Sequence, residues 1–168
     1  MSVIIEAAWF ASVAHAGQVR KYNGAPYITH PIRVAGRVAT HPMATECLVA
    51  AAFLHDVVED CGVSFSEIEF KFGKDVAACV EHLTNIFTVQ NTGKPRDERK
   101  RLEAERIAMI PVGCKIIKLI DRIDNLREMD RCSGFGRTYC RESLLLAESL
   151  KDADGDLYAE LVALCDVP

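Results

Sequence analysis

The residues of this chain best suited to chemistry lie together at His55 and Asp56. They follow the apolar run of residues 47–54, and an imidazole and a carboxylate at the end of a buried segment cost free energy unless a partner compensates them. A bound cation is such a partner. Because Glu59 and Asp60 follow within one helical turn, four potential metal ligands or proton carriers are concentrated in one short segment. The pattern predicts a metal site with proton carriers beside it.

Two residues elsewhere in the sequence could complete this site. His30 stands at the start of a predicted helix, and Asp121 interrupts the apolar face of another. Two imidazoles and two carboxylates form a mixed nitrogen and oxygen set that suits Mn(II), Fe(II) or Zn(II) and leaves positions for water and substrate. Taken singly, His30 could instead cap its helix and Asp121 could pair with a nearby arginine. Together with His55-Asp56 they favour the metal, whereas we expect no ligand role for the remaining histidines, His15, His41 and His82.

Length and composition narrow the class of protein. The 168 residues predict one domain, and a formal charge of -4 argues against a general nucleic-acid binder while allowing a small anionic substrate. Seven cysteines form no Cys-x-x-Cys pair, which favours a reducing compartment over secretion and over a cysteine zinc site. We find no apolar stretch of membrane-spanning length, and therefore expect a cytoplasmic protein without a membrane partner.

Helical periodicity dominates the chain and predicts an all-α bundle of about eight to ten helices. One expected helix, over residues 43–58, would carry His55 and Asp56 near its C-terminal end, where the following carboxylates oppose the helix dipole. Loops are expected over residues 18–29, 85–97 and 133–136, which are rich in glycine, proline or polar residues. The other expected helices cover residues 2–16, 30–39, 64–73, 75–84, 98–110, 111–129, 138–151 and 156–164.

Six segments, in order over about residues 8 to 130, carry a family resemblance. They are His15-Ala-Gly-Gln-Val-Arg-Lys21, Pro26-Tyr-Ile-Thr-His-Pro-Ile32, Ala51-Ala-Phe-Leu-His-Asp-Val-Val-Glu-Asp60, Phe70-Lys-Phe-Gly73, Glu98-Arg-Lys-Arg-Leu102 and Lys115-Ile-Ile-Lys-Leu-Ile-Asp-Arg-Ile-Asp-Asn-Leu-Arg127. The chain resembles the HD-domain metal-dependent phosphohydrolases. Within them it is similar to the hydrolase domain of the RelA/SpoT alarmone enzymes and to the small alarmone hydrolases of the metazoan SpoT homologue type.

The resemblance implies a single HD-type hydrolase domain over residues 1–168, with an HD-domain helical bundle as its fold. It also implies that one divalent ion, normally Mn(II), is bound by His30, His55, Asp56 and Asp121. Glu59 and Asp60 would position and activate the attacking water. Contacts to the nucleotide would come from Arg20, Lys21 and Asn125.

The implied reaction removes the 3′-pyrophosphate from guanosine 3′,5′-bis(diphosphate) (ppGpp) or its pentaphosphate relative, giving GDP or GTP and pyrophosphate. Where small alarmone hydrolases carry an arginine and a tyrosine one helical turn apart, this chain has Tyr139 and Ser143, and its loop 85–97 also departs from the family. Another nucleotide therefore remains an alternative substrate: a dNTP, a nucleoside monophosphate or the 2′-phosphate of NADPH. A non-catalytic nucleotide sensor is a further alternative, which the intact Glu59 and Asp60 disfavour. The expected partner is a small-molecule nucleotide, and assembly into a homo-oligomer is left open.

Overall fold

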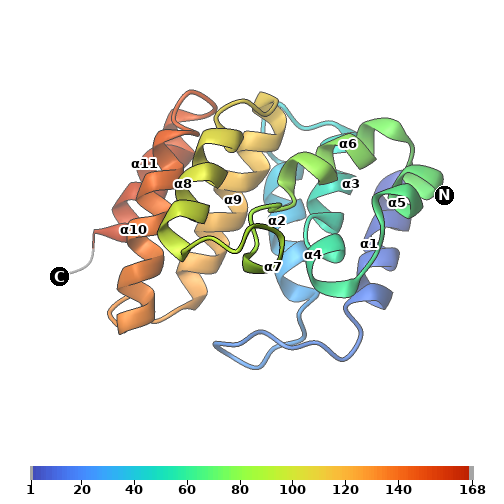
Figure 1. Ribbon diagram of the computed structural model, residues 1–168. Helices are drawn as coiled ribbons and strands as arrows, with labels where there is room; N and C mark the ends of the chain where they lie inside the picture. Colours follow the sequence, from blue (N-terminus) through green and yellow to red (C-terminus); the bar gives the residue numbers. More distant parts are fainter. Residues whose placement is uncertain (1, 167–168) are drawn as a thin grey trace. The chain divides into compact units, whose positions relative to one another are not determined.

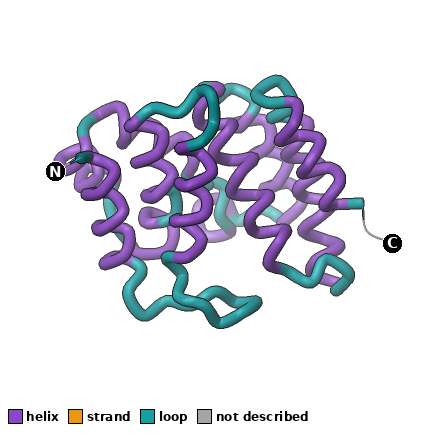
Figure 2. Tube along the Cα trace, turned by 180° about the vertical axis from the view of Figure 1, so that it is seen from behind, coloured by secondary structure: helices purple, strands orange, loops and turns teal. Residues whose placement is uncertain are grey.

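The computed structural model describes residues 2–166, and every regular element within them is a helix (Figures 1 and 2). An isolated bridge between Val19 and Pro26 is the one strand-like pairing in this range. The predicted all-α class is thus confirmed. The described residues form eleven helices, because one predicted helix is broken in two and a short helix lies in a predicted loop. The chain divides into two compact units, one up to Thr84 and one from Asn85, and a single domain over the whole chain stays a prediction.

In the first unit, helix α3 (Glu46–Leu54) packs against α1 (Val3–Ala14), α2 (Thr29–Ala39) and α6 (Lys74–Leu83) (Figure 1). Because α3 has neighbours on several sides, its residues after Glu46 are all apolar. Ala50, Ala51 and Ala52 are fully buried, and their small side chains let neighbouring helices pack close to α3. The unit consists of α1 (Val3–Ala14), α2 (Thr29–Ala39), α3 (Glu46–Leu54), α4 (Val57–Cys61), α5 (Phe65–Phe72) and α6 (Lys74–Leu83).

The expected helix over residues 43–58 is wrong in one respect that matters for the site. Its first half begins at the N-cap Thr45, whose side chain accepts a hydrogen bond from the Leu48 amide, and ends at Leu54. His55 and Asp56 form the turn that follows, and a new short helix, α4, starts at Val57. Hydrophobic periodicity runs through this break and therefore hides it. Glu59 and Asp60 consequently lie within the five-residue α4, which ends at Cys61 and is capped by Gly62, and not at the end of one long helix.

In the second unit, α9 (Val112–Glu128) supplies most of the large, fully buried isoleucine and leucine side chains, and packs against α10 (Gly134–Glu148) and α11 (Gly155–Cys165). The predicted loop 85–97 contains a short helix capped by Thr88. The predicted break at residues 133–136 is the start of a helix, because the Ser133 hydroxyl accepts a hydrogen bond from the Gly136 amide and caps it. This unit consists of α7 (Val89–Thr92), α8 (Arg96–Ile107), α9 (Val112–Glu128), α10 (Gly134–Glu148) and α11 (Gly155–Cys165). None of the described helices has the length and apolar character that a membrane span requires.

Candidate metal centre

Three predicted ligands come together in the first unit. His30, in the first turn of α2, is fully buried, and His55, in the turn after α3, is 2% exposed. Their Nε2 atoms lie 3.2 Å apart. The Asp56 Oδ2 atom lies 3.1 Å from the Nε2 of His55 and 3.6 Å from that of His30. Among the described residues, these three form the group whose donor atoms all lie within 4.8 Å of one another and could hold a metal ion.

The end of α3 orients the His55 ring. The last carbonyl groups of a helix have no partner within the helix, and one of them, that of Ala52, lies 2.8 Å from the Nδ1 of His55. A proton on Nδ1 is donated to this carbonyl, which leaves the lone pair of Nε2 facing His30 and Asp56. Two lone pairs 3.2 Å apart repel unless a proton or a cation lies between them. This donor set, two imidazole nitrogens and one carboxylate oxygen, fits a divalent transition-metal ion with positions left for further ligands.

Tyr27 contacts two members of this group. Its hydroxyl donates a hydrogen bond of 2.8 Å to the Asp56 Oδ2 atom, and its ring lies edge-on to the His30 ring, with centroids 6.1 Å apart. Burial, and then the negative charges of Asp56 and Asp60, raise the pKa of the Tyr27 phenol above its usual range. The phenol therefore keeps its proton and acts as a donor. Sequence reasoning included Tyr27 in a family segment but assigned it no role.

His15, for which no role was expected, is buried behind Tyr27. The two rings are stacked with centroids 4.5 Å apart and planes inclined by 19°. The His15 Nδ1 atom lies 2.8 Å from the Gln18 Oε1 atom, and the Gln18 amide donates to the Asp60 carbonyl at 3.1 Å. The polar loop after α1 is thereby tied to α4. A signal was present in the sequence, since His15 and Gln18 open a family segment.

Arg20 and Lys21, which are predicted to contact the nucleotide, lie in the same loop between α1 and α2. Arg20 is 6% exposed, and its guanidinium carbon lies 5.2 Å from the centroid of the Tyr27 ring. Lys21 is exposed. The loop turns back on itself, because the Arg20 amide donates to the Ala25 carbonyl and Gly24 adopts a positive φ of 70°. Glu59 and Asp60, the predicted acid and base, are exposed on α4 of the same unit.

Asp121 and Asn125 belong to the second unit. Asp121 is 7% exposed on α9, and the Asn125 amide nitrogen donates to its Oδ1 atom at 2.7 Å. The Lys118 ammonium lies 3.7 Å from the Asp121 Oδ2 atom. Arg127, one of the nearby arginines that could have paired with Asp121, instead pairs with Glu160 at 2.8 Å. The participation of Asp121 and Asn125 in the metal and nucleotide site stays a prediction.

The two positions that depart from the family lie on α10 of the second unit. The buried Ser143 hydroxyl donates 2.7 Å to the Tyr139 carbonyl in the preceding turn, so this hydroxyl is engaged within its own helix. The centroid of the Tyr139 ring lies 4.5 Å from the guanidinium carbon of Arg122, whose Nε atom is buried and has no hydrogen-bond partner among residues 2–166. Positions 139 and 143 therefore carry a phenol and an aliphatic hydroxyl, in place of the arginine and tyrosine that the resemblance leads one to expect.

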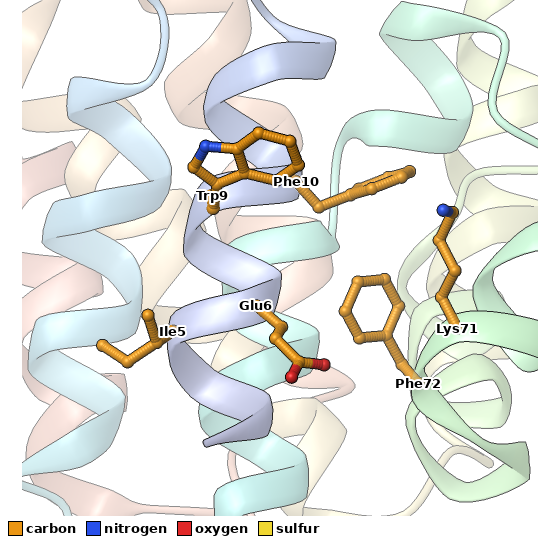
Figure 3. Close-up of a pocket in the computed structure, with 6 residues that line it drawn as sticks. All are labelled: Ile5, Glu6, Trp9, Phe10, Lys71 and Phe72. Carbon is orange, nitrogen blue, oxygen red and sulfur yellow. The ribbon is translucent and has the colours of Figure 1, made fainter. Parts of the chain in front are cut away.

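An apolar hollow of about 460 Å³ in the first unit involves none of the predicted site residues (Figure 3). It lies between α1 and α5, and Trp9 at its edge is 69% exposed. Phe10 and Phe72 pack edge to face inside it, and the Lys71 ammonium lies 5.5 Å from the centroid of the Phe10 ring. The polar group of His30, His55 and Asp56 and this hydrophobic hollow are thus built from different residues.

Comparison with known proteins supports the resemblance seen in the sequence. The HD domain family matches residues 7–163. The guanosine-3′,5′-bis(diphosphate) 3′-pyrophosphohydrolase MESH1 of Homo sapiens is 42% identical over 136 residues, which cover 79% of this chain and 73% of that protein. The bifunctional (p)ppGpp synthase/hydrolase SpoT of Escherichia coli is 37% identical over 117 residues, which cover 69% of this chain and 16% of that protein.

A solved structure supports the same assignment. The metazoan ortholog of SpoT, described as hydrolysing ppGpp, matches with a TM-score of 0.84 and 30% identity, covering 98% of this chain and 94% of its own. The resemblance predicted from the six sequence segments is confirmed. The chain belongs to the HD-domain family, in which it is similar to the MESH1 and SpoT pyrophosphohydrolases.

Proposed function

We propose that this chain is a metal-dependent hydrolase that converts ppGpp or pppGpp to GDP or GTP and pyrophosphate. One observation carries the proposal: His30, His55 and Asp56 converge in a chain that is 42% identical to a ppGpp 3′-pyrophosphohydrolase over most of its length. In this reaction the oxygen of water bonds to the phosphorus next to the ribose 3′ oxygen. The bond from that phosphorus to the 3′ oxygen breaks, and the 3′ oxygen takes up a proton.

Mn(II) is the ion that we propose for the group, with Asp121 as its fourth protein ligand. Zn(II) and Fe(II) suit the same ligands. When bound, a divalent ion supplies a water of lowered pKa and positive charge that offsets the charge gathering on the phosphoryl oxygens. His30 and His55 contribute neutral nitrogens, and Asp56 contributes the negative charge that favours a cation.

The remaining roles follow from side-chain chemistry. Glu59 and Asp60 take the proton from the attacking water and return it to the leaving 3′ oxygen, because carboxylates beside a reacting water can do both. Arg20 and Lys21 bind phosphate oxygens or, through the planar guanidinium, the face of the base. Asn125 contacts the nucleotide from the second unit. We further expect a cytoplasmic protein, because seven cysteines, an odd number with no Cys-x-x-Cys pair, suit a reducing compartment.

Incubation of the purified protein with Mn(II) and a panel of nucleotides tests this function. We expect release of pyrophosphate from ppGpp, with a higher kcat/KM than for dNTPs, nucleoside monophosphates or NADPH. A higher kcat/KM for NADPH or for a dNTP than for ppGpp would instead assign the chain to another nucleotide. The departures at Tyr139 and Ser143 make this the main alternative. Binding of ppGpp without turnover at any metal concentration would identify a sensor.

Arg20→Ala tests the nucleotide contact. A charge-assisted hydrogen bond to phosphate contributes about 1.5–3 kcal/mol, so we expect the KM for ppGpp to rise about tenfold or more, while kcat changes little. Steady-state kinetics at saturating Mn(II) measure this. Arg33→Ala, at an exposed arginine of α2, is the matched control. An unchanged KM in Arg20→Ala would remove Arg20 from the nucleotide site.

A further inference from the structure

We propose that Tyr27 is a positioning residue whose hydroxyl holds the Asp56 carboxylate in the orientation that binds the metal. The inference rests on the metal site of the proposed function and adds to it a residue outside the ligand set. Its starting point is the hydrogen bond of 2.8 Å from the Tyr27 hydroxyl to the Asp56 Oδ2 atom.

The oxygen that accepts this hydrogen bond is the one that faces both histidines. The same Oδ2 atom lies 3.1 Å from the His55 Nε2 atom and 3.6 Å from that of His30. A carboxylate oxygen has two lone pairs, so Oδ2 can accept from Tyr27 with one and bind a cation with the other. The hydroxyl can therefore stay in place when the ion is bound.

Asp56 needs such a partner more than the two histidines do. Both histidine rings are buried, whereas the Asp56 side chain keeps 19% of its surface exposed. The terminal torsion of an aspartate is broad, so an unrestrained carboxylate would rotate among several orientations, some of them toward solvent. A hydrogen bond that is present before the metal binds removes this freedom in advance, which increases metal affinity.

The Tyr27 ring is itself held from several sides, as a rigid support must be. His15 stacks on it with centroids 4.5 Å apart, and the Arg20 guanidinium carbon lies 5.2 Å from its centroid. The His30 ring meets it edge-on. The backbone of Tyr27 is also held in place, since its amide donates a hydrogen bond of 2.9 Å to the Gln18 carbonyl. Phenylalanine at this position would keep the ring contacts and lose the hydroxyl alone.

Tyr27→Phe therefore separates positioning of Asp56 from folding of the loop. Loss of a partner that orients a metal ligand weakens binding by about 10–100-fold, and we expect the Kd for Mn(II) to rise by that factor. Electron paramagnetic resonance of free Mn(II), titrated against metal-free protein, measures the Kd without any turnover. Circular dichroism and the Tm confirm that the variant is folded.

Two companion variants make each outcome decisive. Tyr22→Phe removes a hydroxyl from an exposed tyrosine of the same loop and should leave the Kd unchanged. Asp56→Asn should weaken binding at least as much as Tyr27→Phe. If Tyr27→Phe matches the parent protein while Asp56→Asn loses metal, Tyr27 has no positioning role and the proposed function stands. If Asp56→Asn also keeps its affinity, the metal site itself is misplaced, and the role of Tyr27 falls with it.

A kinetic comparison adds a second readout. If the hydroxyl acts only through the metal, excess Mn(II) should bring the kcat of Tyr27→Phe back to within about twofold of the parent value, with the KM for ppGpp unchanged. A raised KM that persists at saturating Mn(II) would contradict this, because it would place the hydroxyl against the nucleotide.

Discussion

Asp56→Ala should abolish both Mn(II) binding and ppGpp hydrolysis. The substitution removes the one carboxylate of the group in the first unit, and leaves two imidazole rings whose Nε2 atoms lie 3.2 Å apart. Loss of the ion forfeits several kcal/mol of transition-state stabilisation, so a fall in kcat/KM of about 10³-fold or more is expected. Metal content by elemental analysis and pyrophosphate release measure the two effects.

The control for this substitution is Asp75→Ala, at an exposed aspartate on α6 of the same unit. It changes the net charge equally and should keep both metal and activity. If Asp56→Ala is folded and turns over ppGpp like the control, hydrolysis does not use this group of residues. Excess Mn(II) should restore little activity, in contrast to Tyr27→Phe, because a ligand is missing and not merely disordered.

The helices could be predicted wherever apolar side chains recur at helical spacing and the backbone runs on without a break. The expected helix over residues 111–129 is found as α9, Val112–Glu128, because its isoleucine and leucine side chains recur at helical spacing. The break at His55-Asp56 could not be predicted in this way. Residues on both sides of it are buried, and the contact of the His55 side chain with the Ala52 carbonyl at the end of α3 leaves no periodic signal.

The candidate site could be predicted as far as residue types go. Histidine and aspartate after an apolar run, with a second histidine at a helix start, sufficed to identify His30, His55 and Asp56. Pattern alone could not show the supporting contacts. The Tyr27 phenol contacts Asp56, 29 positions later in the sequence, because of the path that the loop takes. Backbone hydrogen bonds such as that from the Arg20 amide to the Ala25 carbonyl set this path. Such pairing is specific to the folded chain.

Glu59→Gln should separate metal binding from turnover. Glutamine keeps the size of the side chain and can accept or donate hydrogen bonds, but it cannot take up a proton from water. Glu59 is exposed in the first turn of α4 and lies outside the group of His30, His55 and Asp56. We therefore expect the Kd for Mn(II) to stay within about twofold, and kcat to fall by about 10²–10⁴-fold, the usual contribution of general acid–base catalysis.

The comparison that decides the role of Glu59 is with Glu69→Gln, an equally conservative change at an exposed glutamate of α5. Glu69→Gln should match the parent protein in both metal binding and kcat. Loss of metal in Glu59→Gln would make Glu59 a ligand, in which case the proton carrier must be sought at Asp60. Full activity would mean that proton transfer needs only one carboxylate of the pair, and Asp60→Asn should then carry the whole effect.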